Sequence, residues 1–85
     1  MASYRVLIKR SAGKELEELA LKDRRRIVER IRGLASDPRP AGCEKLSGEE
    51  KYRVRQGDQR IIYGINDRDS TVTVAKIGHR RDVYR

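Results

Sequence analysis

The sequence contains little of what secreted, membrane-spanning or zinc-binding proteins depend on. Its 85 residues include one cysteine, Cys43, so no disulfide can form within the chain, and such a small chain suits a reducing cytoplasm. No apolar run approaches the ~18 residues that cross a membrane, and the beginning of the chain lacks the apolar segment of a signal peptide. One histidine and one cysteine are too few for a local zinc cluster. We therefore expect a cytoplasmic protein without a metal or cofactor.

Apolar residues are also scarce, whereas charge is abundant. Hydrophobic residues make up 36% and charged residues 40%, against ~45–50% and ~25% in typical globular domains. The length predicts a single domain, residues 1–85, with one lean core. The net charge is +8, and arginine outnumbers lysine by fifteen to six. A basic chain rich in planar guanidinium groups favours an anionic partner: nucleic acid, an acidic protein or an anionic membrane surface.

The apolar pattern predicts a strand followed by two helices. The strand covers residues 4–10, and Ser11 and Asp23 are expected at the N-caps of the two helices. The segment "SDPRPAG", residues 36–42, ends the second helix because Pro38 disfavours helical backbone at the residue before it. The second helix carries an apolar stripe formed by Ile27, Val28, Ile31, Leu34 and Ala35.

Three strand-like runs follow: residues 51–56, 60–66 and 70–77. The dipeptide "GD" at 57–58 is typical of a tight hairpin turn, and "DRDS" at 67–70 joins the last two runs. The short connection between the helices indicates an antiparallel helical hairpin. The order predicts an α+β fold in which this hairpin packs on one face of a mostly antiparallel four-stranded sheet that includes the N-terminal strand.

Basic side chains gather on one face of this predicted sheet. Tyr52 and Val54 suit the core, which leaves Lys51, Arg53 and Arg55 on the opposite face. A charge row on a strand is ordinarily a solvated face, but here the hairpin also brings Arg60 near Arg55, and like charges across a hairpin repel. The end of the chain adds further candidates: His79, Arg80, Arg81 and Tyr84. We predict that an anion binds here, either a phosphate backbone or the carboxylates of an acidic partner.

If that anion is RNA, these residues have the chemistry for cleavage without metal. The reaction needs a base for the 2′-hydroxyl, cations for the charge that develops on the phosphate and an acid for the departing oxygen. The phosphate oxygens would be held by Arg53, Arg55, Arg60 and Arg80. With an ordinary pKa of ~6.5, His79 is the first candidate to move a proton, and Tyr84 could stack on a base or donate a proton. The plain alternatives are a surface histidine and a packed C-terminal tyrosine.

The motifs "L-x-G" ahead of "YRVR", then "RIIY", then "GHRRDVY" resemble the RelE toxins of the RelE/ParE superfamily. The resemblance implies a RelE-like fold and a toxin of a toxin–antitoxin pair. It also implies an endoribonuclease that enters the ribosomal A site and cuts messenger RNA without metal. The implied partners are the ribosome, the messenger and an acidic, RelB-like antitoxin.

The resemblance also implies roles for particular residues. The two catalytic lysines of the best-known members fall on Arg53 and Arg55, and later family positions fall on Arg60, Arg80 and Tyr84. Arginine does not serve as a base, because its pKa is above ~12. His79, which matches a histidine used by other members, is therefore the expected base, with Glu49 and Glu50 as weaker candidates. The expected RNA-binding set is Lys51, Arg53, Arg55, Arg60, Arg80 and Arg81.

Two other functions remain open on the same fold. One is a ParE-like inhibitor of DNA gyrase, a binding protein without RNA chemistry. The other is a non-catalytic module whose basic face serves only an acidic partner. The terminal "GHRRDVY" favours the endonuclease, because the ParE branch typically lacks the catalytic set.

Overall fold

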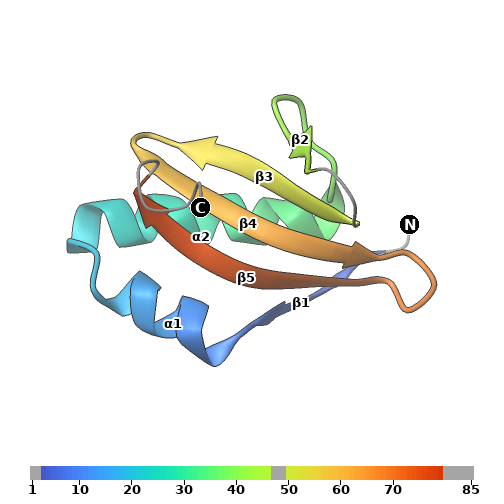
Figure 1. Ribbon diagram of the computed structural model, residues 1–85, viewed down its shortest axis with the longest axis horizontal. Coiled ribbons are helices and arrows are strands. Elements are labelled where there is room, and N and C mark those ends of the chain that lie inside the picture. Colours follow the sequence, from blue (N-terminus) through green and yellow to red (C-terminus); the bar gives the residue numbers. More distant parts are fainter. Residues whose placement is uncertain (1–2, 47–49, 80–85) are drawn as a thin grey trace.

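The computed structural model describes residues 3–46 and 50–79. It contains a five-stranded sheet in the order β1-β5-β4-β3-β2 and two helices, and α2 runs behind the sheet in Figure 1. β1 is parallel to β5, and the other neighbours are antiparallel. The elements are β1 Arg5–Ile8, α1 Arg10–Glu17, α2 Leu21–Ser36, β2 Glu44–Lys45, β3 Lys51–Gln56, β4 Gln59–Asn66 and β5 Thr71–His79.

The predicted α+β class is confirmed, with one strand more than expected. The fifth strand, β2, is two residues long and pairs with β3 at the edge of the sheet. A pair of residues is too short to show an alternating pattern in the sequence, so only the pairing itself reveals it. The described helices include none long and apolar enough to cross a membrane.

The helix starts differ from the prediction. The first strand ends at Ile8, and α1 begins at Arg10 with Lys9 as its cap residue, so Ser11 lies inside the helix. Asp23 is not the cap of α2 but lies in its first turn, where a carboxylate still interacts favourably with the helix dipole. Neither helix has a side-chain hydrogen bond at its N-cap. Capping therefore does not set these boundaries, and the place where the chain leaves the sheet fixes the start of α1.

The core lies between α2 and the sheet. Ile27, Ile31 and Leu34 of α2 are buried, and the sheet contributes Tyr52, Val54, Ile61, Tyr63, Ile65, Val72, Val74 and Ile77. The β4–β5 register shifts between Ile62 and Tyr63, which makes Ala75 an extra residue, as in a β-bulge. The bulge lets Val74 and Ile77, three positions apart, both enter the core.

The turn at Gly57 and Asp58 is confirmed, and it sets the position of the basic residues. Gln56 pairs with Gln59, so only these two residues connect β3 to β4. Gly57 has φ +62°, a left-handed conformation that glycine adopts without steric penalty. This register places Arg55 directly opposite Arg60.

We expect Leu34→Ala to destabilise the protein strongly. Leu34 is 1% exposed beneath the sheet, and truncating such a residue typically costs ~2–5 kcal/mol through lost burial and the cavity that remains. The matched control is Leu21→Ala on the same helix, because Leu21 is 56% exposed; its effect should stay within ~0.5 kcal/mol. Urea unfolding measures both free energies, and equal losses would contradict the described core.

Candidate functional site

Three arginines gather on the face of the sheet opposite α2. Arg55 pairs with Arg60 across the hairpin, and Arg53 lies two positions earlier on β3, so all three leave the sheet on the same side. Arg53 is 7% exposed and Arg60 4% exposed, whereas Arg55 is exposed. We call Arg53, Arg55 and Arg60 the arginine cluster. Two of its members are buried, so they are not part of an ordinary solvated strand face.

A carboxylate that the sequence analysis missed lies within this cluster. Glu44 pairs with Arg53 in the sheet, and the Arg53 guanidinium donates a 2.8 Å hydrogen bond to its carboxylate. That hydrogen bond, together with the charges of Arg53, Arg55 and Arg60, holds the pKa of Glu44 below its usual range. All three arginines therefore act on one carboxylate. No motif signals Glu44 in the sequence, because its position depends on the two-residue strand β2.

The cluster is built to bind an anion. Three guanidinium groups gather beside the Glu44 carboxylate, and guanidinium donors match phosphate oxygens in geometry. Burial of Arg53 and Arg60 fixes their side chains before a ligand arrives, which is the preorganisation that stabilises developing charge. Within residues 3–46 and 50–79, no three His, Cys, Asp or Glu side chains are grouped to hold a metal ion.

The structure does not bring His79 onto the face of the arginine cluster. His79 pairs with Gln59, and Arg60 pairs with Gly78. Because successive residues of a strand leave opposite faces, His79 and Arg60 are directed to opposite sides of the sheet. His79 lines a hollow of about 280 Å³ with Glu15, Glu18 and Leu19 of the α1 side. Of the other predicted site residues, Glu49, Arg80, Arg81 and Tyr84 lie outside the described residues.

The loop after α2 is fastened to the sheet by Arg39. Its guanidinium donates two hydrogen bonds to the Asp67 carboxylate, at 2.9 and 3.2 Å, and lies 5.1 Å from the ring centre of Tyr52. The Tyr4 hydroxyl donates to the same carboxylate at 2.6 Å. These hydrogen bonds, that from Arg39 first, hold the pKa of Asp67 below its usual range. We call Tyr4, Arg39, Tyr52 and Asp67 the Arg39 network; it joins four segments that are distant in the sequence.

Glu50 lies beside this network, at the opposite end of β3 from Arg55. It accepts hydrogen bonds from the Lys45 ammonium at 3.3 Å and the Tyr52 hydroxyl at 3.1 Å. Both contacts hold its pKa below the usual range, the one from Lys45 contributing most. Glu50 is thus ionised and held away from the arginine cluster, which weakens its candidacy as the catalytic base.

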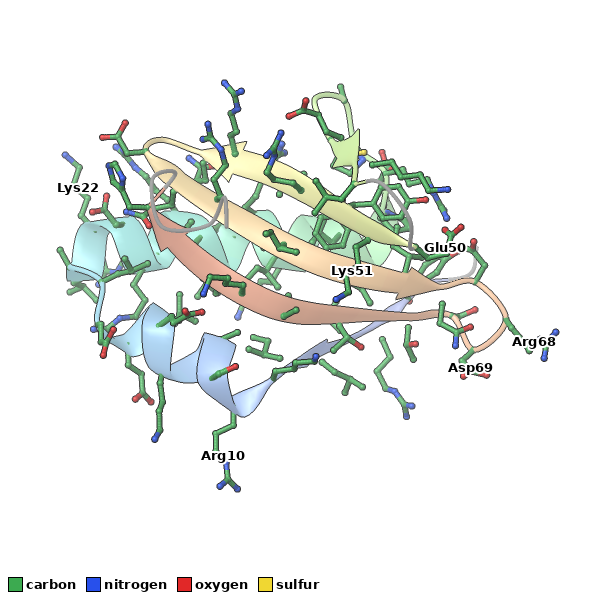
Figure 2. All side chains as sticks on the ribbon, in the orientation of Figure 1. Arg10, Lys22, Glu50, Lys51, Arg68 and Asp69 are labelled. Atoms are coloured by element: carbon green, nitrogen blue, oxygen red, sulfur yellow. The ribbon has the colours of Figure 1, made fainter. Side chains whose placement is uncertain are left out.

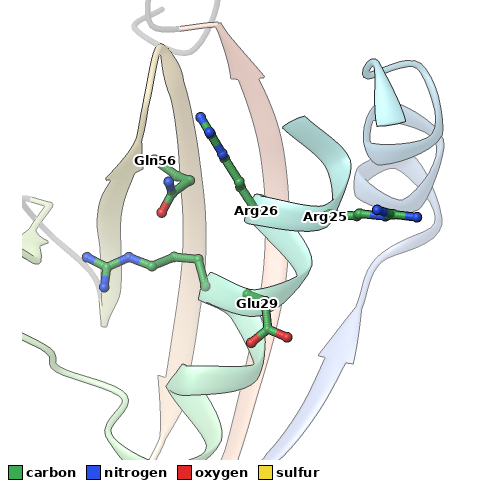
Figure 3. A pocket seen from close by; sticks show the side chains of 5 residues that line it. Arg25, Arg26, Glu29 and Gln56 are labelled. Carbon is green, nitrogen blue, oxygen red and sulfur yellow. The ribbon is translucent and has the colours of Figure 1, made fainter. Parts of the chain in front are cut away.

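A second basic area lies on the helix side. Arg25, Arg26, Glu29 and Arg30 of α2 line a hollow of about 430 Å³ together with Gln56 of β3. Figure 3 shows Arg26 extending towards the end of β3 that carries Gln56, whereas Arg25 points away from it. The positive charge of the chain is therefore distributed over both faces of the sheet. The arginine cluster differs from this helix-side area because two of its arginines are buried and one of them contacts Glu44.

The chain is similar to known toxins along most of its length. The family described as the ParE toxin of the type II toxin–antitoxin system parDE matches residues 6–84. Toxin RelG of Mycobacterium tuberculosis is 30% identical over 86 residues, which cover 96% of this chain and 97% of that protein.

Solved structures agree in fold. The archaeal RelE–RelB complex of Pyrococcus horikoshii OT3 contains a chain with a TM-score of 0.84 and 33% identity, covering 92% of this chain and 96% of that one. A chain of the toxin–antitoxin complex RelBE2 of M. tuberculosis has a TM-score of 0.82 and 26% identity, with 93% and 100% covered. Both were crystallised as toxin–antitoxin complexes.

The sheet, the two helices and these matches define the class: a toxin of a type II toxin–antitoxin system. The chain belongs to the RelE/ParE toxin superfamily. The resemblance that the sequence motifs indicate is therefore confirmed, together with the RelE-like fold.

We expect Asp67→Asn to lower stability at neutral pH and to lose this effect in acid. The native pKa of Asp67 is lowered, so its contribution is fully present above the unfolded value of ~3.9 and disappears as pH falls through the native value. Melting temperatures of wild type and variant should differ at pH 7 and converge as pH falls below ~4. Asp58→Asn, in the exposed β3–β4 turn, is the control. A difference that persists unchanged in acid would contradict the role of the Arg39 network.

Proposed function

We propose that this toxin is an endoribonuclease that cuts messenger RNA in the ribosomal A site, without metal, and thereby inhibits translation. The observation that carries the proposal is the arginine cluster: two buried arginines and one exposed arginine beside the Glu44 carboxylate, on the sheet face that α2 leaves uncovered. Similarity to RelE proteins supports the same class of activity.

The cluster supplies the electrostatic part of the reaction. The 2′-oxygen of the RNA attacks the neighbouring phosphorus, a P–O2′ bond forms and the P–O5′ bond breaks, leaving a 2′,3′-cyclic phosphate and a 5′-hydroxyl. Arg53, Arg55 and Arg60 hold the non-bridging oxygens while charge accumulates on them. Removing one such preorganised donor typically lowers the rate ~10²–10³-fold.

The proton transfers need other groups, because arginine stays protonated. His79 is the base that the sequence predicts, and Tyr84 and Arg80 are predicted to act on the leaving group and the phosphate. The strand register directs His79 to the side opposite Arg60. Cleavage by a His79 variant is therefore the measurement that decides its role.

The proposed partner of the free toxin is an acidic, RelB-like antitoxin. The relatives from P. horikoshii and M. tuberculosis were crystallised with their RelB-type partners, and the net charge of +8 on this chain suits an acidic one. A toxin that acts on ribosomes works in the cytoplasm, which is the compartment that the sequence predicts.

We expect Arg60→Ala to lower cleavage of ribosome-bound messenger RNA by ~10²–10³-fold. Arg80→Ala and His79→Ala are tested beside it. The matched control is Arg68→Ala, since Arg68 is exposed in the β4–β5 turn (Figure 2). Primer extension on a stalled ribosomal complex measures the cuts. Undiminished cutting by all three site variants would refute the site, and no cutting by wild type would refute the function.

The match to the ParE family favours one second candidate, a DNA gyrase inhibitor. Such a protein would block supercoiling by purified gyrase and leave ribosome-bound messenger RNA intact. A supercoiling assay with the same preparation separates the two functions. We expect no inhibition, because the buried arginine cluster suits phosphate chemistry.

A further inference from the structure

A hollow of about 460 Å³ lies on the same sheet face as the arginine cluster. Its lining comprises Glu50, Lys51, Gly64, Ile65, Asn66 and Thr73. Figure 2 shows Lys51 over the face of the sheet turned away from α2, with Glu50 beside it at the start of β3. The volume falls within the ~300–1,000 Å³ of ordinary ligand pockets. The arginine cluster does not contribute to this lining, so the hollow is a separate site.

A continuous row of cations connects the hollow to the cluster. Lys51, Arg53 and Arg55 are alternate residues of β3 and lie opposite Gly64, Ile62 and Arg60 of β4. At a rise of ~3.3 Å per residue, Lys51 is ~13 Å along the strand from Arg55. A basic track of this kind follows the backbone of a single strand of nucleic acid. An RNA strand bound at the arginine cluster would therefore extend along β3 into the hollow.

The floor of the hollow accepts a flat ring. Gly64 has no side chain, and a Cβ built there would meet only the Glu50 carbonyl oxygen, at 3.6 Å. Gly64 lies between Lys51 of β3 and Thr73 of β5, its partners on the two neighbouring strands. The rim thus offers a cationic donor at Lys51 and a hydroxyl at Thr73. The Glu50 carboxylate does not contribute, because Lys45 and the Tyr52 hydroxyl hold it on the Tyr52 side of the strand.

We infer that this hollow binds an unpaired nucleotide of the RNA, a neighbour of the one whose phosphate occupies the arginine cluster. Lys51 contacts its phosphate, and its base lies over Gly64. The inference rests on the proposed function, because it assumes RNA at the arginine cluster.

The test is RNA binding by the full chain, without ribosomes. The probes are fluorescein-labelled oligoadenylates of two to six nucleotides, 2′-O-methylated throughout so that they cannot be cut. Anisotropy should show a step in affinity at the length that first reaches the hollow, because that nucleotide adds the Lys51 phosphate contact and the burial of its base over Gly64. Gly64→Leu, which fills the floor, should remove this step and leave the affinity of the shortest probe unchanged.

Lys51→Gln has a matched control in Lys22→Gln, because Lys22 is an exposed residue of α2 (Figure 2). For a long probe, Lys51→Gln should reduce the slope of log affinity against log salt by ~0.7, the loss of one phosphate contact on a single strand. Lys22→Gln should leave the slope close to that of wild type. If both variants reduce the slope equally, the row is a general basic surface and the inference is wrong.

Absence of a length step would overturn the nucleotide site. Because the probes cannot be cut, this result is independent of cleavage. A toxin that cuts messenger RNA but shows no step refutes only the hollow, whereas a step without cutting refutes only the proposed activity.

Discussion

The positive charge concentrated on the β3–β4 hairpin is the constraint on which the site depends. Arg55 and Arg60 face each other across the strands, and like charges in directly opposite positions destabilise a sheet. Glu44 reduces this repulsion by accepting a 2.8 Å hydrogen bond from Arg53 beside them. The three guanidinium groups of the cluster therefore form a surface suited to an anion.

The two faces of the sheet have different roles: one carries the hydrophobic core and the other carries the candidate functional site. α2 covers one face, and its buried residues pack on the apolar side chains of β3, β4 and β5. The opposite face is left to the cations of β3 and to the hollow floored by Gly64. The Arg39 network fastens the loop after α2 to the end of the sheet. A small core thus supports a rigid, charged surface, which an electrostatic site requires.

The sequence predicted the hairpin well because two independent signals coincide there. Tyr52 and Val54 alternate with cations, and "GD" indicates the turn, so strand, register and basic face follow together. The helix starts were predicted less well, because Ser11 and Asp23 are common capping residues that here lie inside their helices. Glu44 was missed, since a two-residue strand has no periodicity. The sequence also placed His79 beside the arginines, whereas the register of β4 with β5 directs it to the other side of the sheet from Arg60.

By itself the sequence determined the class of fold, the basic character and the residues that gather on β3 and β4, because alternation and turn chemistry are local properties of the chain. Only the tertiary structure decided which cations are buried, which carboxylate lies among them and to which side His79 is directed. Those features depend on pairings between distant segments, β2 with β3 and β4 with β5. A one-residue difference in such a pairing moves a side chain to the other face of the sheet, and no local pattern specifies it.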